Sequence, residues 1–437
     1  MLPSISKIFE KVACIRFTTF LENNSLLGDF QHGFRKEKST VTAAVNFLES
    51  IIESIDRGEQ VVGVFMDISK AFDSVDHNLL LLKLKEIGVR NTSLHWFQSY
   101  LSRRQQYVQI SYTTPSNYLL KVNSNLTEIK CGVPQGSILG PILFLCYLKN
   151  IQKCLNFTLS STLCLYADDS NLKVSGKTTE DVEMFTAIEV ASIEQFLNSH
   201  YLNLNSNKTK CINFKTKQSK VNSCPTIEIR GEEVEVTNKT TFLGLVVDNN
   251  LTWDEHIKSI LGKISAGLFA IRKMSSLCDL KTLKLLYFSH IQSHIAYGIC
   301  IYGATTKENF NSILKIQKQA IRCMLHLKHN DSVRQHFRDL NILTVYGLYI
   351  FDCIMFVRRH KYNLTRSIPL HHYNTRCKEN YRFETHRLKF YEKKTVYMGE
   401  KFLEKIPNYI KMEVKEHLFK VKLKNYLSDL TLYSLDL

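Results

Sequence analysis

Three aspartates lie at the ends of apolar segments that have the composition of buried β-strands. Asp67 closes the run QVVGVFMDI, and Asp168 and Asp169 follow the run TLCLYA much later in the chain. Ionised carboxylates avoid a low-dielectric interior unless a cation or another partner compensates them. Because neighbouring strands could bring the three side chains together, we expect a positive group beside them.

An oxygen-only site of this kind suits Mg²⁺, which takes a few carboxylates, retains water molecules and accepts substrate phosphates. Two such ions can deprotonate an attacking hydroxyl and stabilise a leaving pyrophosphate. Taken alone, the pair Asp168 and Asp169 has an ordinary alternative, because adjacent aspartates are common in turns. The interpretation therefore depends on the segments around the pair.

The elements that would position the acids follow from the hydrophobic pattern. Residues 60–68 form a short apolar run after a turn signal, which predicts a buried strand ending at Asp67. The segment LYADDSN predicts a hairpin with the acidic pair at its tip. Between these segments, a Gly/Pro turn over residues 132–136 precedes a mostly apolar helix, so a backbone could pass close to another group there.

The composition limits the classes of function. The chain has 437 residues, of which 44% are hydrophobic and 22% charged, enough for a large core in roughly two or three packed units. The balance of 57 Lys and Arg against 41 Asp and Glu indicates a polyanionic partner such as nucleic acid or a membrane surface. Zinc-ligand spacing among the 12 cysteines, a secretory signal and a membrane-length apolar run are not evident. We therefore expect an intracellular protein, nuclear or cytoplasmic, without a membrane partner.

The hydrophobic pattern and the charge of the chain change after Asn249. From Trp253 the pattern is mainly helical and more basic, which places a domain boundary near Asn249. Residues 376–425 carry 14 Lys and Arg against 7 Asp and Glu, interleaved with aromatic residues, a composition suited to a nucleic-acid groove. The same spacing is equally typical of a helical core with solvated charged faces. The pattern does not decide between the two interpretations.

Three motifs in this order, FMDISKAFDSVDH, GVPQGSILGPILF and LYADD, closely resemble the reverse transcriptases of non-LTR (LINE-type) retrotransposons, in particular insect jockey-like and RTE-like elements. LPSISKIFEKV and QHGFRKEKST resemble the finger blocks of these enzymes, and LNLNSNKTK and FLGLVVDNNLTWDEHI resemble later palm blocks. HHYNTR and GEKFLEKIP resemble the segment after the thumb. The resemblance covers nearly the whole chain and implies an RNA-directed DNA polymerase that extends a 3′-hydroxyl primer on an RNA template.

The resemblance also implies a ligand set for two Mg²⁺ ions. Asp67 and Asp168 would be the principal ligands, and Ile68 would add a backbone carbonyl. Asp169 would be secondary, because adjacent residues at a tight hairpin cannot both point toward one position.

The same resemblance implies five nucleotide-binding residues. Phe72 would lie beside the sugar of the incoming nucleotide, where its ring would clash with a ribose 2′-hydroxyl and so select deoxynucleotides. Gln135 and Gly136 would lie against the nascent base pair and the template, although PQGS is also an ordinary turn sequence. Arg35 would bind the triphosphate through its planar, charged guanidinium group, and Lys208 would neutralise or protonate the pyrophosphate. For Lys208 alone, a solvated surface lysine is the ordinary alternative.

The implied fold class is α+β, a right-hand polymerase. Fingers and a palm with an antiparallel sheet would span residues 1–248, a helical thumb 249–335 and a basic helical region 336–437. The partners would be an RNA template, a DNA primer and dNTPs. Because the chain begins inside a finger block, we expect an N-terminally truncated copy of an element, with an endonuclease acting in trans as one option.

Two alternatives stay open at the level of the sequence. An RNA-dependent RNA polymerase also places paired acids at a hairpin and could use Asp73 as a second acid of the first motif. Phe72 and YADD favour DNA synthesis over this alternative. The other is a catalytically silent nucleic-acid-binding relic, in which truncated fingers have removed activity and a basic surface still holds RNA.

Overall fold

The computed structural model describes residues 4–134, 136–156, 160–219, 226–229, 231–360 and 383–435. They form two compact units, each built from separated stretches of the chain. Unit 1 contains the described residues of Met1–Ala43, Val62–Cys211 and Asn222–Val236, and unit 2 contains those of Ala44–Val61, Ile212–Val221 and Thr237–Leu437. Since neither unit is one continuous range, the division at residues 248 and 335 stays a prediction from the sequence.

The helices of unit 1 begin and end where local chemistry favours it. The Asp76 carboxylate accepts the amide of Leu79 and caps the N-terminus of α3, while Gly88 at φ +111° ends this helix. A capping box of Thr178 and Asp181 starts α6. The helices are α1 (Ser4–Asn23), the start of α2 (Thr40–Asp56), η1 (Ala71–Asp73), α3 (His77–Ile87), α4 (Asn91–Leu101), α5 (Gly140–Tyr147), η2 (Ile151–Cys154) and α6 (Thr179–Ser199).

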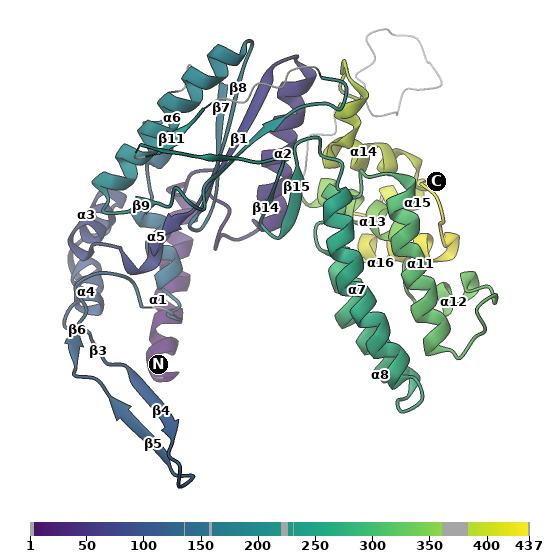
Figure 1. The fold of residues 1–437 in the computed structure, drawn as a ribbon, viewed down its shortest axis with the longest axis horizontal. Coiled ribbons are helices and arrows are strands. Elements are labelled where there is room, and N and C mark those ends of the chain that lie inside the picture. Colours follow the sequence, from purple (N-terminus) through teal and green to yellow (C-terminus); the bar gives the residue numbers. More distant parts are fainter. Residues whose placement is uncertain are drawn as a thin grey trace. The chain divides into compact units, whose positions relative to one another are not determined.

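A five-stranded sheet is the centre of unit 1 (Figure 1). Its strand order is β13–β10–β1–β8–β7, with β1 (Gln60–Met66), β7 (Ser160–Tyr166), β8 (Asp169–Gly176), β10 (Lys210–Phe214) and β13 (Glu235–Val236). β7 and β8 are antiparallel, as predicted for the acidic hairpin. β10 and β13 are parallel, so the sheet is mixed and departs from the predicted antiparallel palm at this edge.

The core of unit 1 joins the sheet to its helices. Helix α5 is apolar on every side and seven of its residues are buried, which is typical of a helix in the middle of a core. Val62, Val64 and Met66 of β1 and Leu172 and Val174 of β8 belong to the same apolar cluster. This core fixes the ends of β1 and β8.

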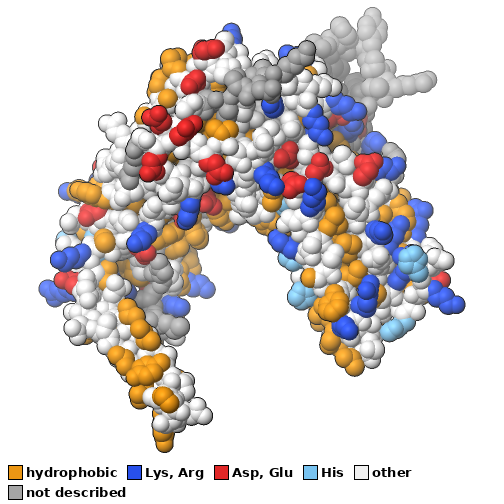
Figure 2. Space-filling view, viewed as in Figure 1, with side chains coloured by type: hydrophobic (Ala, Val, Ile, Leu, Met, Phe, Trp, Pro, Cys, Tyr) orange, Lys and Arg blue, Asp and Glu red, His pale blue; other side chains and the backbone are white. Residues whose placement is uncertain are grey.

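Short two-stranded ribbons complete unit 1. Their strands are β2 (Ile68–Ser69) with β9 (Asn203–Leu204), β3 (Gln105–Gln106) with β6 (Thr127–Glu128), β4 (Gln109–Thr113) with β5 (Leu119–Asn123), and β11 (Glu228–Ile229) with β12 (Glu232–Glu233). Every residue of β4 and β5 is exposed. Figure 2 shows apolar side chains gathered over this ribbon. Its exposed apolar residues include Ile110 and Leu119.

Unit 2 is mainly helical, in agreement with the pattern predicted from Trp253 onward. It contains most of α2, a hairpin of β14 (Lys239–Phe242) and β15 (Leu245–Asp248), and the elements α7 (Asp254–Met274), α8 (Leu280–Tyr287), the π-helical segment η3 (Phe288–Gln292), α9 (Ser293–Ala296), α10 (Ile299–Tyr302), α11 (Lys307–Met324), α12 (Arg334–Asp339), α13 (Val345–Arg359), η4 (Lys389–Lys393), α14 (Thr395–Lys405), α15 (Asn408–Lys411) and α16 (Glu416–Leu430). No helix in the described part of the chain is both long enough and apolar enough to cross a bilayer.

Aromatic contacts hold these helices together. Phe310 of α11 stacks on Tyr346 of α13 with ring centroids 4.7 Å apart, and Tyr349 packs edge-on against Phe402 of α14. Phe402 and Tyr391 come from the aromatic-rich segment 376–425, and both are buried. For these two residues the core interpretation of that segment is therefore correct. Tyr381 lies outside the described residues.

Candidate active site

The three predicted acids lie where two neighbouring interior strands of the central sheet of unit 1 end or begin. Asp67 directly follows β1, and Asp169 is the first residue of β8, the strand beside β1. Tyr166 pairs with Asp169 across the hairpin, which leaves Ala167 and Asp168 as a two-residue turn. We call Asp67, Asp168 and Asp169 the acid edge.

The charge of Asp169 is affected by the other two carboxylates of the acid edge. The pKa of Asp169 is raised, first because the surrounding protein reduces the hydration of its carboxylate and then because Asp168 and Asp67 repel its negative charge. One cation lies nearby: the Lys208 ammonium is 3.3 Å from a carboxylate oxygen of Asp67. Both partners are solvent-accessible, and such a pair stabilises by at most about 1 kcal/mol. A single lysine therefore leaves the acid edge with an excess of negative charge.

The donor set of the acid edge fits a hard divalent cation, because it consists of carboxylate oxygens with mutual repulsion to relieve. Among the residues that the structure describes, no three His, Cys, Asp or Glu side chains are gathered closely enough to form a metal site. The carboxylates would have to draw together around an incoming cation.

The loop that carries Lys208 is attached to the backbone beside Asp67. Ile68 of β2 pairs with Leu204 of β9, and the amide of Asn205 donates to the carbonyl of Asp67 at 2.9 Å. These bonds explain why a lysine so distant in sequence lies next to the first acid. The carbonyl role of Ile68 stays a prediction.

Phe72 lies in the short helix η1 that follows Asp67. It is half-buried, and its ring packs against Phe144 of α5 with centroids 4.7 Å apart. The Phe72 carbonyl accepts the amide of Val133, so the start of the Gly/Pro turn is joined to the same short helix. At Gly132, φ is +86° and an added Cβ would lie 2.9 Å from the carbonyl oxygen of Asp73, which explains why glycine is needed at this close approach.

The PQGS turn presents open backbone at Gly136. This residue has φ +78°, and no atom of the described residues lies within 4 Å of the position that a Cβ would take. Gln135 lies outside the described residues. The far side of the turn is held by Glu10, a buried carboxylate that accepts the amide of Ile138 at 2.7 Å. Glu10 could not be identified from the sequence, because a single acid among apolar residues of a helix has no pattern of its own.

Arg35 is an internal brace in this structure. Its guanidinium donates to both carboxylate oxygens of Glu22, at 2.9 and 2.7 Å, and to the carbonyls of Gly28 and Gln31. Only 8% of its side chain is exposed. This arrangement departs from the predicted binding of a triphosphate, because the Arg35 guanidinium would first have to break its hydrogen bonds to Glu22.

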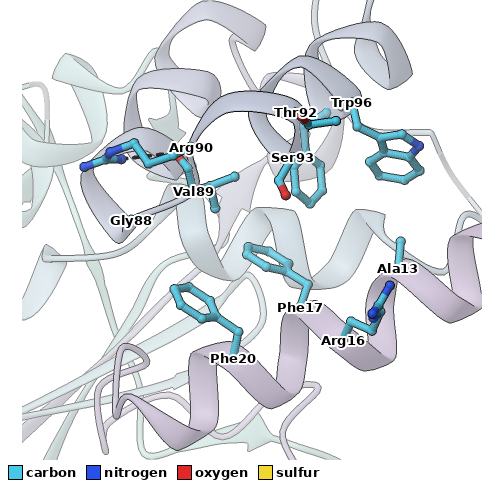
Figure 3. Close-up of a pocket in the computed structure, with 11 residues that line it drawn as sticks. Ala13, Arg16, Phe17, Phe20, Gly88, Val89, Arg90, Thr92, Ser93 and Trp96 are labelled. Carbon is cyan, nitrogen blue, oxygen red and sulfur yellow. Dashed lines mark hydrogen bonds between the residues drawn. The ribbon is translucent and has the colours of Figure 1, made fainter.

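A separate pocket of about 600 Å³ lies between α1 and the start of α4. Figure 3 shows that Phe17 and Phe20 reach into it from α1, with Trp96 and Ser93 coming from α4. The acid edge does not line this pocket. Pocket size therefore does not locate the chemistry here, whereas the arrangement of charge does.

Residues 1–247 match the family model described as reverse transcriptase (RNA-dependent DNA polymerase). The chain belongs to the reverse transcriptase family. The matched range includes Asp67, Asp168 and Asp169, together with the segments that position them. The predicted right-hand polymerase fold class is that of this family, whose members generally use divalent metal ions and copy an RNA template.

Similar proteins point to one branch of this family. The chain is 27% identical over 361 residues to the probable RNA-directed DNA polymerase from transposon BS of Drosophila melanogaster, covering 79% of this chain and 38% of that protein. It is 26% identical over 353 residues to the RNA-directed DNA polymerase from mobile element jockey of the same organism, covering 78% of this chain and 37% of that protein. The predicted resemblance to non-LTR, LINE-type reverse transcriptases is thus confirmed, and the chain spans less than half the length of these relatives.

Among solved structures, the chain is similar to telomerase from Candida albicans in complex with the TWJ fragment of telomeric RNA. The sequence identity is 13% and the TM-score is 0.39, over 82% of this chain and 54% of that chain. A likeness of this size adds nothing to the assignment, which depends on the family match.

Proposed function

We propose that the chain is an RNA-directed DNA polymerase of a non-LTR retroelement, which adds dNTPs to the 3′-hydroxyl of a DNA primer on an RNA template. The observation that carries the proposal is the acid edge, where Asp168 and Asp67 repel the charge of Asp169 and, among the described residues, Lys208 is the cation paired with Asp67. A protein keeps such a costly arrangement where a cation is to be bound. Membership of the reverse transcriptase family supports the same conclusion.

In this proposal Asp67 and Asp168 are the principal ligands of two Mg²⁺ ions, and Asp169 and the Ile68 carbonyl assist them. Bound there, the cations would lower the pKa of the primer hydroxyl and neutralise charge on the triphosphate. Lys208, which now pairs with Asp67, would lose that partner to the metal and become available to the pyrophosphate.

Substrate positioning is assigned to the segments around the acids. Phe72 would exclude a ribose 2′-hydroxyl, because its ring is held by Phe144 and cannot easily withdraw. Gly136 and Gln135 would present backbone to the nascent base pair and template. The formal net charge of +16 would attract the polyanionic template and primer in the nucleus or cytoplasm, with an endonuclease acting in trans as an option.

Primer extension on poly(rA)/oligo(dT) with Mg²⁺ tests the proposal, with binding to the same duplex measured in parallel. We expect dTTP incorporation by the wild-type chain, and its loss in Asp168→Asn at unchanged duplex binding. Binding without extension in either protein would instead support the catalytically silent relic.

The proposed exclusion of ribonucleotides by Phe72 has its own test. Substituting Phe72→Ala should raise rNTP incorporation relative to dNTP incorporation, because the ring that blocks the 2′-hydroxyl is removed. Equal discrimination in both proteins would contradict the role of Phe72, and a preference of the wild type for rNTPs would indicate an RNA-dependent RNA polymerase.

A further inference from the structure

The turn that carries Asp168 has an unfavourable backbone conformation. Ala167, its first residue, has φ +58°, in the left-handed region that L-residues other than Asn and Asp rarely adopt. Ala167 is also buried, so its amide must find a partner within the protein. A strained turn keeps one geometry only when the surrounding structure holds it.

The surrounding contacts come from residues 30–33, which lie beside β7. Gln31 forms a parallel bridge with Leu165; the amide of Leu165 donates to Phe30 and the amide of His32 donates to Leu165, each at 2.8 Å. Residues 30–33 therefore lie next to the turn that carries Asp168.

The Gln31 side chain makes the contact to the turn itself. Its oxygen accepts the amide of Ala167 at 3.1 Å and the amide of Gly33 at 2.8 Å, and the residue is only 4% exposed. One buried acceptor thus joins the strained turn to residues 30–33. An aliphatic side chain of similar size would leave both amides without this acceptor.

Gly33 allows the two segments to approach this closely. A Cβ at position 33 would lie 2.4 Å from the backbone nitrogen of Ala167, a distance that forces the turn to move. The backbone of Gln31 is held in turn, because Arg35 donates to its carbonyl at 3.3 Å while bound to Glu22. The contacts run from the end of α1 through Arg35 and Gln31 to the turn that holds Asp168.

We propose that Gln31 is a positioning residue, which fixes the Ala167–Asp168 turn so that the Asp168 carboxylate is held in the orientation that the reaction needs. Gly33 provides the space for this contact. The inference rests on the proposed polymerase function for its catalytic consequence, but the restraint on Ala167 can be measured without catalysis.

The test compares Gln31→Met, which keeps side-chain volume and removes the acceptor, with Gln31→Glu, which keeps an acceptor oxygen. Gln317→Met is the matched control in unit 2, because Gln317 is also buried and also accepts a backbone amide, that of Val345 at 2.8 Å. Hydrogen exchange is followed at single amides in metal-free buffer. We expect the Ala167 amide to exchange about five- to tenfold faster in Gln31→Met, with Leu165 unchanged, and to stay protected in Gln31→Glu and Gln317→Met.

Primer extension supplies the second measurement. The kcat of Gln31→Met should fall by about ten- to a hundredfold, with little change in the KM for dTTP, because a misplaced catalytic group affects the reaction more than nucleotide binding. Gln317→Met should keep its kcat per folded molecule. Unchanged Ala167 exchange in Gln31→Met, or faster exchange with unchanged kcat, would overturn the proposal.

Gly33→Ala is the second variant, in case Gln31→Met does not fold. It keeps Gln31 but pushes on Ala167, and should also speed exchange at Ala167 and lower kcat. Unchanged exchange and kcat in this variant would count against the proposal. If the wild-type chain shows no extension at all, the polymerase function fails, while faster exchange at Ala167 in Gln31→Met would still establish the restraint.

Discussion

Two groups of charged side chains in this protein differ in how their charge is compensated. At the acid edge of unit 1, Asp168 and Asp67 repel the charge of Asp169 beside the accessible Lys208. In unit 2, Lys394 is buried, lies 2.6 Å from Glu53 and donates to the Tyr391 hydroxyl at 2.9 Å. Nearby Glu49 accepts the amide of Val396 at the start of α14. We call Lys394, Glu53 and Tyr391 the Lys394 network; Glu49 stays outside it, because burial raises its pKa to about 7.

The pKa values show the same difference. Burial alone would lower the pKa of Lys394, but hydrogen bonds to Glu53 and Tyr391 outweigh this effect and raise it. The Lys394 charge therefore stabilises the fold, whereas the charge of Asp169 opposes it, as its raised pKa indicates. The compensated charge of Lys394 fits a structural role, and the like charges around Asp169 suit a site for a cation.

The largest expected effect is on activity at the acid edge. Asp67→Asn should reduce primer extension by about a thousandfold or more, because it removes a principal carboxylate ligand of the proposed ions. Its thermal unfolding temperature should stay the same or rise, since one repelling charge is lost. A marked loss of stability in this variant would show that the acid edge is structural and would remove the contrast with unit 2.

The next effect should be on stability in the Lys394 network. Lys394→Met should lower the free energy of unfolding by about 1–2 kcal/mol, because the partly exposed Glu53 carboxylate and the Tyr391 hydroxyl lose their partner. Urea denaturation at pH 7 measures the change. Since the folded-state pKa of Lys394 is raised, its contribution is complete at this pH and is lost only as pH rises through that value.

Lys258→Met is the matched control for this variant. Lys258 also lies 2.6 Å from a glutamate oxygen, that of Glu255, but the Lys258 side chain is 72% exposed, against 7% for Lys394. Its loss should change stability little, because solvent already screens the pair. If both variants lost the same free energy of unfolding, burial of the lysine would not determine how much its ion pair contributes to stability.

A third prediction concerns the brace formed by Arg35 and Glu22. Arg35→Met should cost about 2 kcal/mol, because it leaves the Glu22 carboxylate and the Gln31 carbonyl without their Arg35 donor, while the Gly28 carbonyl keeps the amide of Gln31. Glu22→Gln should cost part of this, and the double variant little more than Arg35→Met alone. If Arg35 instead grips the triphosphate, Arg35→Met should raise the KM for dTTP far more than Glu22→Gln does.

The smallest effect is the pH dependence at Asp169. Its raised pKa means that the folded protein holds this proton more tightly than the unfolded chain does. Stability is thus lost as pH rises from the ordinary value of 3.8 through the folded-state pKa. Asp169→Asn should therefore be more stable than wild type by a few tenths of a kcal/mol at pH 7 without metal. Denaturation at pH 7 and pH 3 should show this advantage only at the higher pH.

Much of the acid edge could be predicted from the sequence, because short continuous stretches of residues define the strands and the turn that carry the acids. A β-rich run ending at Asp67 and a hairpin with Asp168 at its tip are defined by short apolar patterns and turn residues. Lys208 could be named only through the family resemblance. Its position beside Asp67 depends on the pairing of β2 with β9, which no local pattern encodes.

Residues whose partners are distant in sequence could not be assigned in this way. Arg35 carries the charge suited to a triphosphate, and only the fold shows that Glu22 and two carbonyls already occupy it. Glu10 and Gln31 were missed because single polar residues in apolar surroundings have no pattern of their own. Tyr391 and Phe402 fitted two interpretations equally until their burial was known.

The contact of Phe72 with Phe144 has one more consequence. Phe144 lies in α5, which is buried on all sides, so the proposed barrier to ribose is supported from inside the protein. Substitutions that never meet a nucleotide, such as a smaller residue at position 144, could therefore relax the distinction between the two sugars. Fidelity toward DNA precursors would then depend on interior packing as much as on the surface that the substrate meets.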